Sequence, residues 1–92
     1  MFYKSNFGVL KDNYLLLYKL NSEMIVLDDI TAIEINERKV EILIFYNYFK
    51  NLIFDFTISM DNHQELKFSF DREDLESAIE FKNTILNAKF SA

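Results

Sequence analysis

The hydrophobic pattern of this chain changes its period once, at Asp71, and that change limits the folds open to it. Before Asp71, apolar residues alternate with polar ones, most clearly over 52–60 and 64–70. Alternation places successive side chains on opposite faces of a strand. After Asp71, apolar residues recur every three or four positions, which is the spacing of an amphipathic helix. The sequence therefore predicts a mainly β, α+β fold with one C-terminal α-helix.

Polar clusters divide the β-rich part into about seven antiparallel strands. Turns are predicted at Asn21-Ser22-Glu23, at the charged Glu37-Arg38-Lys39 and at Asp61-Asn62-His63. A single helix can cover one face or open end of a strongly bent sheet. The predicted architecture is thus a barrel or strongly bent sheet, with strands within about 7–70, capped by the helix. The strand segments are 7–10, 14–20, 24–27, 30–36, 40–49, 52–60 and 64–70.

The helix is predicted from about Arg72 to about Lys89. Asp71 is a favourable N-cap residue, and Asp74 follows three positions later in an approximate capping box. Phe81 lies off the centre of the apolar stripe, so it could add to an exposed surface, as could Phe90. The stripe itself is predicted to consist of Leu75, Ala78, Ile79, Ile85 and Leu86, interrupted by Lys82.

The amino-acid composition excludes or disfavours several classes of binding site and partner. The 92 residues, read as one domain spanning 1–92, contain no cysteine, no proline, one glycine and one histidine. Disulfides, thiolate zinc sites and glycine-rich phosphate loops are therefore excluded. The net charge of −5 and the pI near 4.7 disfavour nucleic acid and phosphoinositide or other anionic membrane surfaces as partners.

Two polar clusters are candidate sites. His63, with Asp61 and Glu65, could form a base or metal site, but no second histidine or cysteine completes a soft metal site. A solvated hairpin tip is the favoured interpretation. Asp28-Asp29 could bind a hard cation, but a tight turn is favoured there. No catalytic residue, cofactor or metal ligand is predicted, and the chain is not expected to be an enzyme.

The expected location is the cytoplasm of a bacterium. The first residues lack the basic and apolar regions of a signal peptide, and no stretch approaches the roughly 20 apolar residues of a membrane span. Lysine outnumbers arginine eight to two, and Asn, Ile, Phe and Tyr are abundant. These amino acids have AT-rich codons, which indicates a low-GC bacterial source.

The segment 42–49 is the most informative for function, because both of its faces are apolar or aromatic. Read as one strand, Ile42, Ile44, Tyr46 and Tyr48 share a face, with Phe45 and Phe49 on the other. Either this is a central strand covered on both faces, or it exposes a surface for a partner. The candidate interaction surface consists of Phe45, Tyr46, Tyr48 and Phe49.

The local sequence also resembles a known family. Residues 8–17 form a predicted hairpin, and residues 25–33 contain the step Leu27-x-x-Ile30-Thr31-x-Ile33. Both features are similar to bacterial pleckstrin-homology-like (PH-like) domains, and the resemblance implies a PH-like fold. The first hairpin loop, Lys11-Asp12-Asn13, has one cation and one anion. It departs from the several Lys and Arg residues of the phosphoinositide-binding pattern, so the resemblance does not extend to lipid headgroup binding.

The expected function is that of a non-catalytic interaction domain. It would bind a protein or peptide, or a second copy as a homodimer, through the aromatic strand surface. One alternative is a small acidic inhibitor or immunity-type protein that masks a basic target site. Another is a small-ligand or lipid-binding barrel, although a barrel of this size is usually filled by its own side chains.

Overall fold

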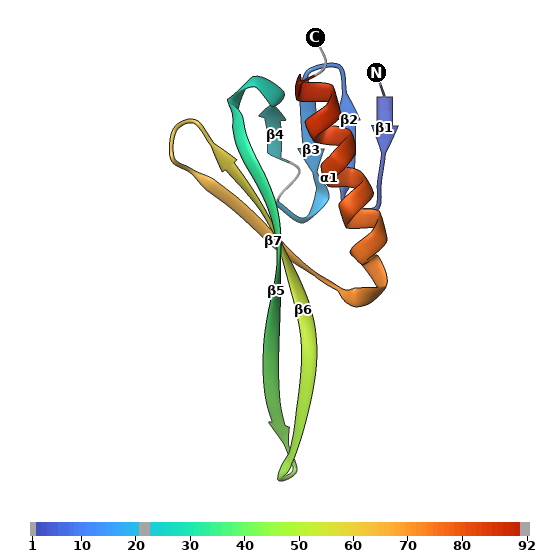
Figure 1. Ribbon diagram of the computed structural model, residues 1–92, viewed down its shortest axis with the longest axis vertical. Coiled ribbons are helices and arrows are strands. Elements are labelled where there is room, and N and C mark those ends of the chain that lie inside the picture. Colours follow the sequence, from blue (N-terminus) through green and yellow to red (C-terminus); the bar gives the residue numbers. More distant parts are fainter. Residues whose placement is uncertain (1, 21–22, 91–92) are drawn as a thin grey trace.

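The computed structural model describes residues 2–20 and 23–90, and it is mainly β with one C-terminal helix, as predicted (Figure 1). Seven strands are present among the described residues, all in antiparallel pairs. They form a four-stranded sheet of order β1-β2-β3-β4 and a three-stranded sheet of order β5-β6-β7. The strands are β1 (Phe2–Lys4), β2 (Gly8–Lys11), β3 (Tyr14–Leu17), β4 (Glu23–Val26), β5 (Ile30–Ile44), β6 (Asn47–Met60) and β7 (Glu65–Asp71). Short 3-10 turns lie at η1 (Tyr18–Leu20), η2 (Leu27–Asp29) and η3 (Arg72–Asp74), and α1 spans Leu75–Phe90.

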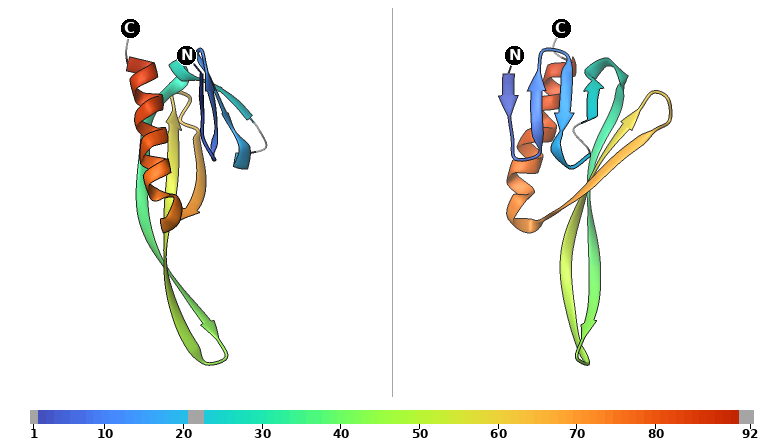
Figure 2. Two further views of the ribbon diagram at one scale, coloured as in Figure 1. Left: turned by 90° about the vertical axis from the view of Figure 1, so that its right-hand side faces the viewer. Right: turned by 180° about the vertical axis from the view of Figure 1, so that it is seen from behind.

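The core lies between the two sheets and α1 (Figure 2). Phenylalanine rings from β6, β7, α1 and the segment before β2 meet there. Phe56 of β6 lies 4.9 Å from Phe68 of β7 and 5.9 Å from Phe81 of α1, measured between ring centroids. Phe7, just before β2, lies 6.0 Å from Phe81. Each fully buried ring of this kind contributes about 2–3 kcal/mol through removal of apolar surface from water, so these contacts hold helix and sheets together.

The only glycine in the chain permits a close approach of two strands. Gly8 begins β2, and a Cβ atom at this position would lie 2.0 Å from the carbonyl oxygen of Leu16 in β3. No side chain fits at that separation. Gly8 therefore lets β2 and β3 pair tightly in the register Gly8↔Leu17.

Of the two predicted forms, a barrel or a strongly bent sheet, the closed barrel is not the one that the structure has. In the part of the chain described, no ladder joins the four-stranded sheet to the three-stranded one. The chain passes from β4 to β5 through η2, and β5 then pairs with β6 alone. The number of strands agrees with the prediction because two errors cancel. β1 was missed, and two predicted segments, 30–36 and the first half of 40–49, form the single strand β5.

The turns around this strand were also misplaced. Glu37-Arg38-Lys39 lies in the middle of β5 rather than in a turn, and the chain reverses at Phe45 and Tyr46. Hairpin turns of this type favour Asn-Gly, so two aromatic residues gave no turn signal. The hairpin turn after Met60 is where it was predicted. Residues 21 and 22, part of the predicted turn at 21–23, lie outside the described residues.

The helix begins three residues later than predicted. Asp71 is the last residue of β7, paired with Ile53, and its side chain makes no capping hydrogen bond. The first turn, η3, is a 3-10 turn, and α1 follows. The capping box is therefore not formed, because the extended backbone of Asp71 continues the strand.

The buried stripe of α1 is rotated relative to the prediction. Ala78, Phe81 and Ile85 are fully buried, whereas Ile79 is exposed. Phe81 was placed at the margin of the stripe, but it lies at its centre because Phe7 and Phe56 surround it. Phe90, at the end of α1, is exposed.

Candidate functional site

The most unusual part of the molecule is a long two-stranded arm. β7 pairs with β6 only from Ile53 to Ser59. Beyond this point β5 and β6 continue together as residues 39–52, which we call the arm. Figures 1 and 2 show the arm leaving the body with no other element beside it, and the molecule extends 54 Å along one axis against 26 and 22 Å along the others. The arm presents two strand edges with no backbone partner among the described residues.

All four predicted surface residues lie at the end of this arm, and all are exposed. The exposed fraction is 89% for Phe45, 96% for Tyr46, 70% for Tyr48 and 50% for Phe49. The alternative, a strand covered on both faces, is therefore wrong. Ile42, Leu43 and Ile44 are also exposed, so the apolar end of the arm extends over both strands.

The grouping of these residues into faces differs from the prediction, because the chain reverses between them. Ile42 lies opposite Phe49, and Leu43 lies opposite Tyr48. Directly opposed residues share a face of a hairpin. Phe49 therefore lies with Ile42 and Ile44, and Tyr48 lies with Leu43.

The apolar face of the sheet changes sides where the arm begins. In the body, Ile33 of β5 and Phe54 of β6 face the core. Following the two-residue period along each strand, the same face of the arm carries charged residues. We call it the front face. It consists of Lys39, Glu41, Leu43, Tyr48, Lys50 and Leu52, and all three charged residues of the arm lie on it.

The opposite face of the arm, the back face, is free of charge. In the body this side of the sheet is polar, with Asp55 and Thr57 on β6. On the arm it becomes apolar, and its only polar side chains are amides. Its residues are Val40, Ile42, Ile44, Asn47, Phe49 and Asn51. A hairpin that merely projected into water would be polar on both faces, so this apolar face needs a covering surface.

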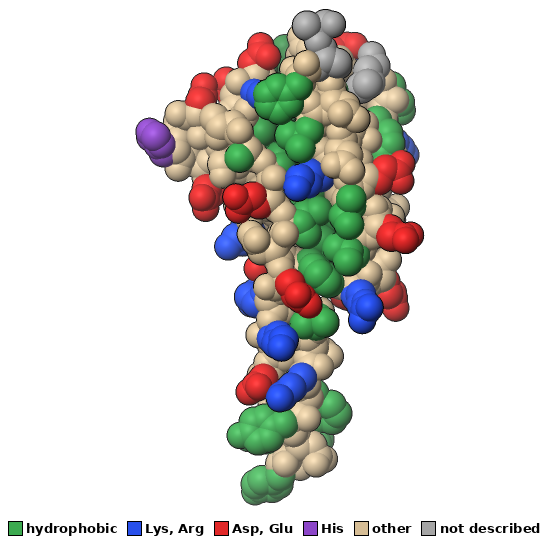
Figure 3. Space-filling view, viewed as in Figure 1, with side chains coloured by type: hydrophobic (Ala, Val, Ile, Leu, Met, Phe, Trp, Pro, Cys, Tyr) green, Lys and Arg blue, Asp and Glu red, His purple; other side chains and the backbone are tan. Residues whose placement is uncertain are grey.

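Charges along the arm are few and balanced. Lys50 Nζ lies 3.9 Å from Glu41 Oε1 across the front face, and both side chains are exposed. Lys39 brings the charge of residues 39–52 to +1, against −5 for the whole chain. Figure 3 shows the blue and red side chains along the arm and the green, hydrophobic ones at its end.

The turn that ends the arm has an unfavourable backbone. Phe45 has φ 50° and Tyr46 has φ 67°. This left-handed region costs a residue with a Cβ atom about 1–2 kcal/mol. Strain of this kind is concentrated at functional sites, where the side chain matters more than the backbone energy.

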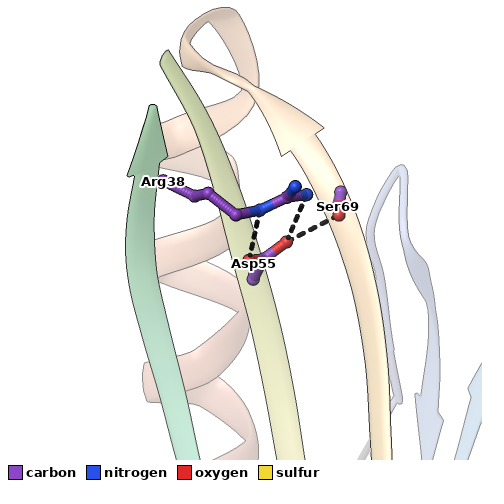
Figure 4. A network of polar contacts seen from close by, with 3 residues as sticks. All are labelled: Arg38, Asp55 and Ser69. Atoms are coloured by element: carbon purple, nitrogen blue, oxygen red, sulfur yellow. Dashed lines mark hydrogen bonds and ion pairs between the residues drawn. The ribbon is translucent and has the colours of Figure 1, made fainter. Parts of the chain in front are cut away.

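A polar network holds the root of the arm (Figure 4). Arg38 of β5 donates from Nε to Asp55 Oδ2 at 3.0 Å and from Nη2 to Asp55 Oδ1 at 3.3 Å. Ser69 of β7 donates from Oγ to Asp55 Oδ1 at 2.7 Å. One residue from each strand of the three-stranded sheet thus meets at one carboxylate, just above the point where β7 leaves β6.

The environment of Asp55 stabilises its charged form. The hydrogen bond from Ser69, and then that from Arg38, lower the pKa of Asp55 below its ordinary value, although burial opposes this. The alternation over 52–60 places Asp55 on the face opposite Phe54 and Phe56, and it does lie on the side away from the core. It is nevertheless buried, because it belongs to the central strand and its partners come from both neighbouring strands. An isolated aspartate in an alternating strand gives no signal of such a network.

The other predicted polar clusters lie apart from the arm. His63 has φ 68° in the turn between β6 and β7, where Asn62 Oδ1 accepts a hydrogen bond from Gln64 N. Asp28 and Asp29 lie in η2, whose carbonyl groups accept bonds from Lys89 Nζ at 3.1 and 3.3 Å. Over residues 2–20 and 23–90, no group of three His, Cys, Asp or Glu side chains could hold a metal ion. Over the same ranges, no helix has the length and apolar character needed to cross a membrane.

Two of the open hollows on the surface lie on different sheets. One, of about 520 Å³, lies at the root of the arm and is lined by residues 50–53 and 71–73. The other, of about 430 Å³, lies on the four-stranded sheet and includes Val9, Tyr14, Leu16 and Met24. Neither is an enclosed cavity, and the side chains between the sheets form a continuous core.

No family model, curated protein or solved structure matches this chain.

Proposed function

We propose that this protein is a non-catalytic interaction domain that binds a protein surface through the arm. The observation that most strongly supports this function is the apolar back face, together with the exposed aromatic residues Phe45 and Tyr46 at the end of the arm. Aromatic side chains are enriched in the centres of protein interfaces, where they bury large areas with few rotatable bonds. The surrounding residues of the arm make no contact with the core that would explain their apolar character.

The proposal includes a PH-like assignment for the body. Paired antiparallel strands enclose an aromatic core and are followed by one C-terminal helix that packs against both sheets. The two sheets are not joined into a barrel, and the long β5–β6 hairpin is an extension of the PH-like arrangement. Fold alone does not define function, so the arm carries the functional argument.

The proposal is tested with tagged wild-type protein and a variant that removes the two exposed rings. Phe45→Asn with Tyr46→Gly gives the residues that this turn prefers, so the arm is expected to stay folded. Both baits are incubated with lysate of the source organism to which untagged protein has been added. Bound proteins, including the untagged chain, are measured by mass spectrometry at low and high salt.

Binding through the arm predicts a partner that the wild type retains at high salt and the variant loses. Apolar contacts are insensitive to salt, whereas contacts between surface charges are screened. A partner that both baits bind at low salt and lose at high salt would instead support the acidic, inhibitor-type function. If the two baits bind the same proteins at both salt concentrations, the arm is not the binding surface.

A further inference from the structure

We infer that the surface covered by the arm is a second copy of this chain, packed antiparallel with the two back faces in contact. This inference rests on the proposed function and names its partner. The back face carries no charge from residue 39 to residue 52, so two identical faces meet without like-charge repulsion despite a net charge of −5. The charged residues Lys39, Glu41 and Lys50 lie on the front faces and stay in water.

The sequence of the back face along β5 is self-complementary about Ile42. In an antiparallel pair centred on this residue, Ile44 of one copy lies over Val40 of the other, and the turn with Tyr46, which follows Ile44, comes close to Arg38 of the other copy. The Arg38 side chain is about half exposed (53%), and Asp55 fixes its position through two hydrogen bonds. Tyrosine rings pack favourably on such guanidinium groups. The aliphatic residues thus meet at the middle of the arms, and each aromatic end reaches the root of the other arm.

The available area fits a weak but specific dimer. Added together, the exposed fractions of Phe45, Tyr46 and Phe49 correspond to rather more than two fully exposed aromatic residues. Those of Ile42 and Ile44 correspond to nearly one fully exposed isoleucine. This amounts to roughly 600 Å² per copy, or about 1,200 Å² in total, the lower end of specific interfaces. Obligate dimers bury far more, so we expect a dimer that dissociates at micromolar concentrations.

A lipid bilayer is a less suitable partner for the same residues. The strands of the arm have unpaired backbone groups along both outer edges, over residues 39–52. In hydrocarbon such groups lack hydrogen-bond partners and each costs several kcal/mol. Between two packed arms the edges remain in water, where those groups are solvated.

The test is sedimentation velocity from about 1 to 500 μM with two neighbouring substitutions. Ile42→Glu places a charge at the centre of the back face, and Leu43→Glu places the same charge on the front face. Leu43 is the more exposed of the two, which makes it a matched control. We expect a wild-type dimer, a dissociation constant raised about 100-fold or more by Ile42→Glu, and a change below about 3-fold for Leu43→Glu. Circular dichroism checks that both variants fold.

Crosslinking tests the antiparallel orientation, and the absence of native cysteine makes an introduced one unique. With a short bis-maleimide, Ile42→Cys is expected to crosslink to itself. Ile44→Cys is expected to crosslink efficiently only when mixed with Val40→Cys. Efficient self-crosslinking of Ile44→Cys would show parallel arms and overturn the inferred geometry.

Other outcomes overturn the second copy as the partner. These are a wild type that is monomeric throughout, equal dissociation by both glutamate variants, or a monomer that sediments with anionic vesicles unless Ile42 is replaced. The proposed function is tested separately, because a wild-type monomer that still captures another protein through Phe45 and Tyr46 would leave that function standing. Loss of both self-association and arm-dependent capture would overturn both.

Discussion

The strained turn at the end of the arm gives the sharpest test of the link between structure and function. Replacing Phe45 by Asn and Tyr46 by Gly should stabilise the isolated protein, although it removes the two most exposed aromatic rings. Both residues have positive φ values, 50° and 67°, in the native turn. Asparagine tolerates this region, and glycine enters it without steric penalty. Ordinary surface substitutions change stability by less than about 0.5 kcal/mol, so a clear gain identifies the backbone as its source.

The size of the gain follows from the two strained residues. Each costs about 1–2 kcal/mol in the left-handed region, and part of the relief is lost because glycine has more freedom in the unfolded chain. We expect a net gain of about 1–2 kcal/mol, which raises the Tm of a domain of this size by about 5–15 °C. Amide hydrogens of residues 42–49 should exchange about tenfold more slowly, since about 1.4 kcal/mol corresponds to a factor of ten.

The assay is urea unfolding followed by circular dichroism, at a protein concentration below that of any dimer. Amide hydrogen exchange of the arm is measured in parallel. If the arm opens separately from the body, a gain in the stability of the arm slows its exchange even when global unfolding does not change. His63→Gly is the matched control. His63 has φ 68° in the turn between β6 and β7, and the substitution relieves the same strain at a residue that is not aromatic surface.

Two results would refute the reasoning. If His63→Gly stabilises the protein and the arm variant does not, Phe45 and Tyr46 make contacts that compensate for their backbone. If neither variant is more stable, positive φ values at these turns store no energy that substitution can recover.

Three further predictions concern the body. Phe81→Ala should lower the free energy of unfolding by about 3–5 kcal/mol, whereas Phe90→Ala on the same helix should change it by less than about 0.5 kcal/mol, as measured by urea unfolding. Asp55→Asn should cost about 1–3 kcal/mol at pH 7. Because the native pKa of Asp55 is lowered, its stabilisation is present above about pH 4, the ordinary pKa of aspartate, and is lost as the pH falls through the native pKa. The free energies of unfolding of the wild type and Asp55→Asn should therefore converge as the pH is lowered below the ordinary aspartate range. Gly8→Ala should destabilise the protein by more than 1 kcal/mol and lower its Tm, because the added Cβ would collide with the Leu16 carbonyl oxygen.

The strands of the body were predictable because apolar and polar residues alternate along them with a period of two. Phe54, Phe56 and Ile58 alternate with polar residues along β6, and Phe68 and Phe70 do so along β7. Each of these rings is buried, as the alternation required. The helix was also recognisable from its spacing. Its exact buried stripe was not, because the position of Phe81 depends on rings from other elements.

The arm was not predictable as an arm, for two physical reasons. Its turn lacks the glycine or asparagine that usually marks a tight hairpin, so the apolar run 42–49 resembled one strand. Its root, Glu37-Arg38-Lys39, resembled a turn because it is charged. The aromatic residues were identified as a candidate surface all the same, because apolar side chains on both faces of one segment violate the alternation seen elsewhere.

Four features that are unfavourable in an isolated chain coincide in the arm: an apolar back face, aromatic rings exposed at its end, unpaired strand edges and a strained turn. A two-stranded ribbon is marginally stable on its own, and each of these features lowers its stability further. The network of Arg38, Asp55 and Ser69 stabilises the root of the arm but makes no contact with the residues beyond it. Selection for folding alone would shorten such a hairpin or make it polar. The features are consistent with one another only if a second surface covers the back face, and the self-complementarity about Ile42 makes another copy of the same chain the surface that fits it.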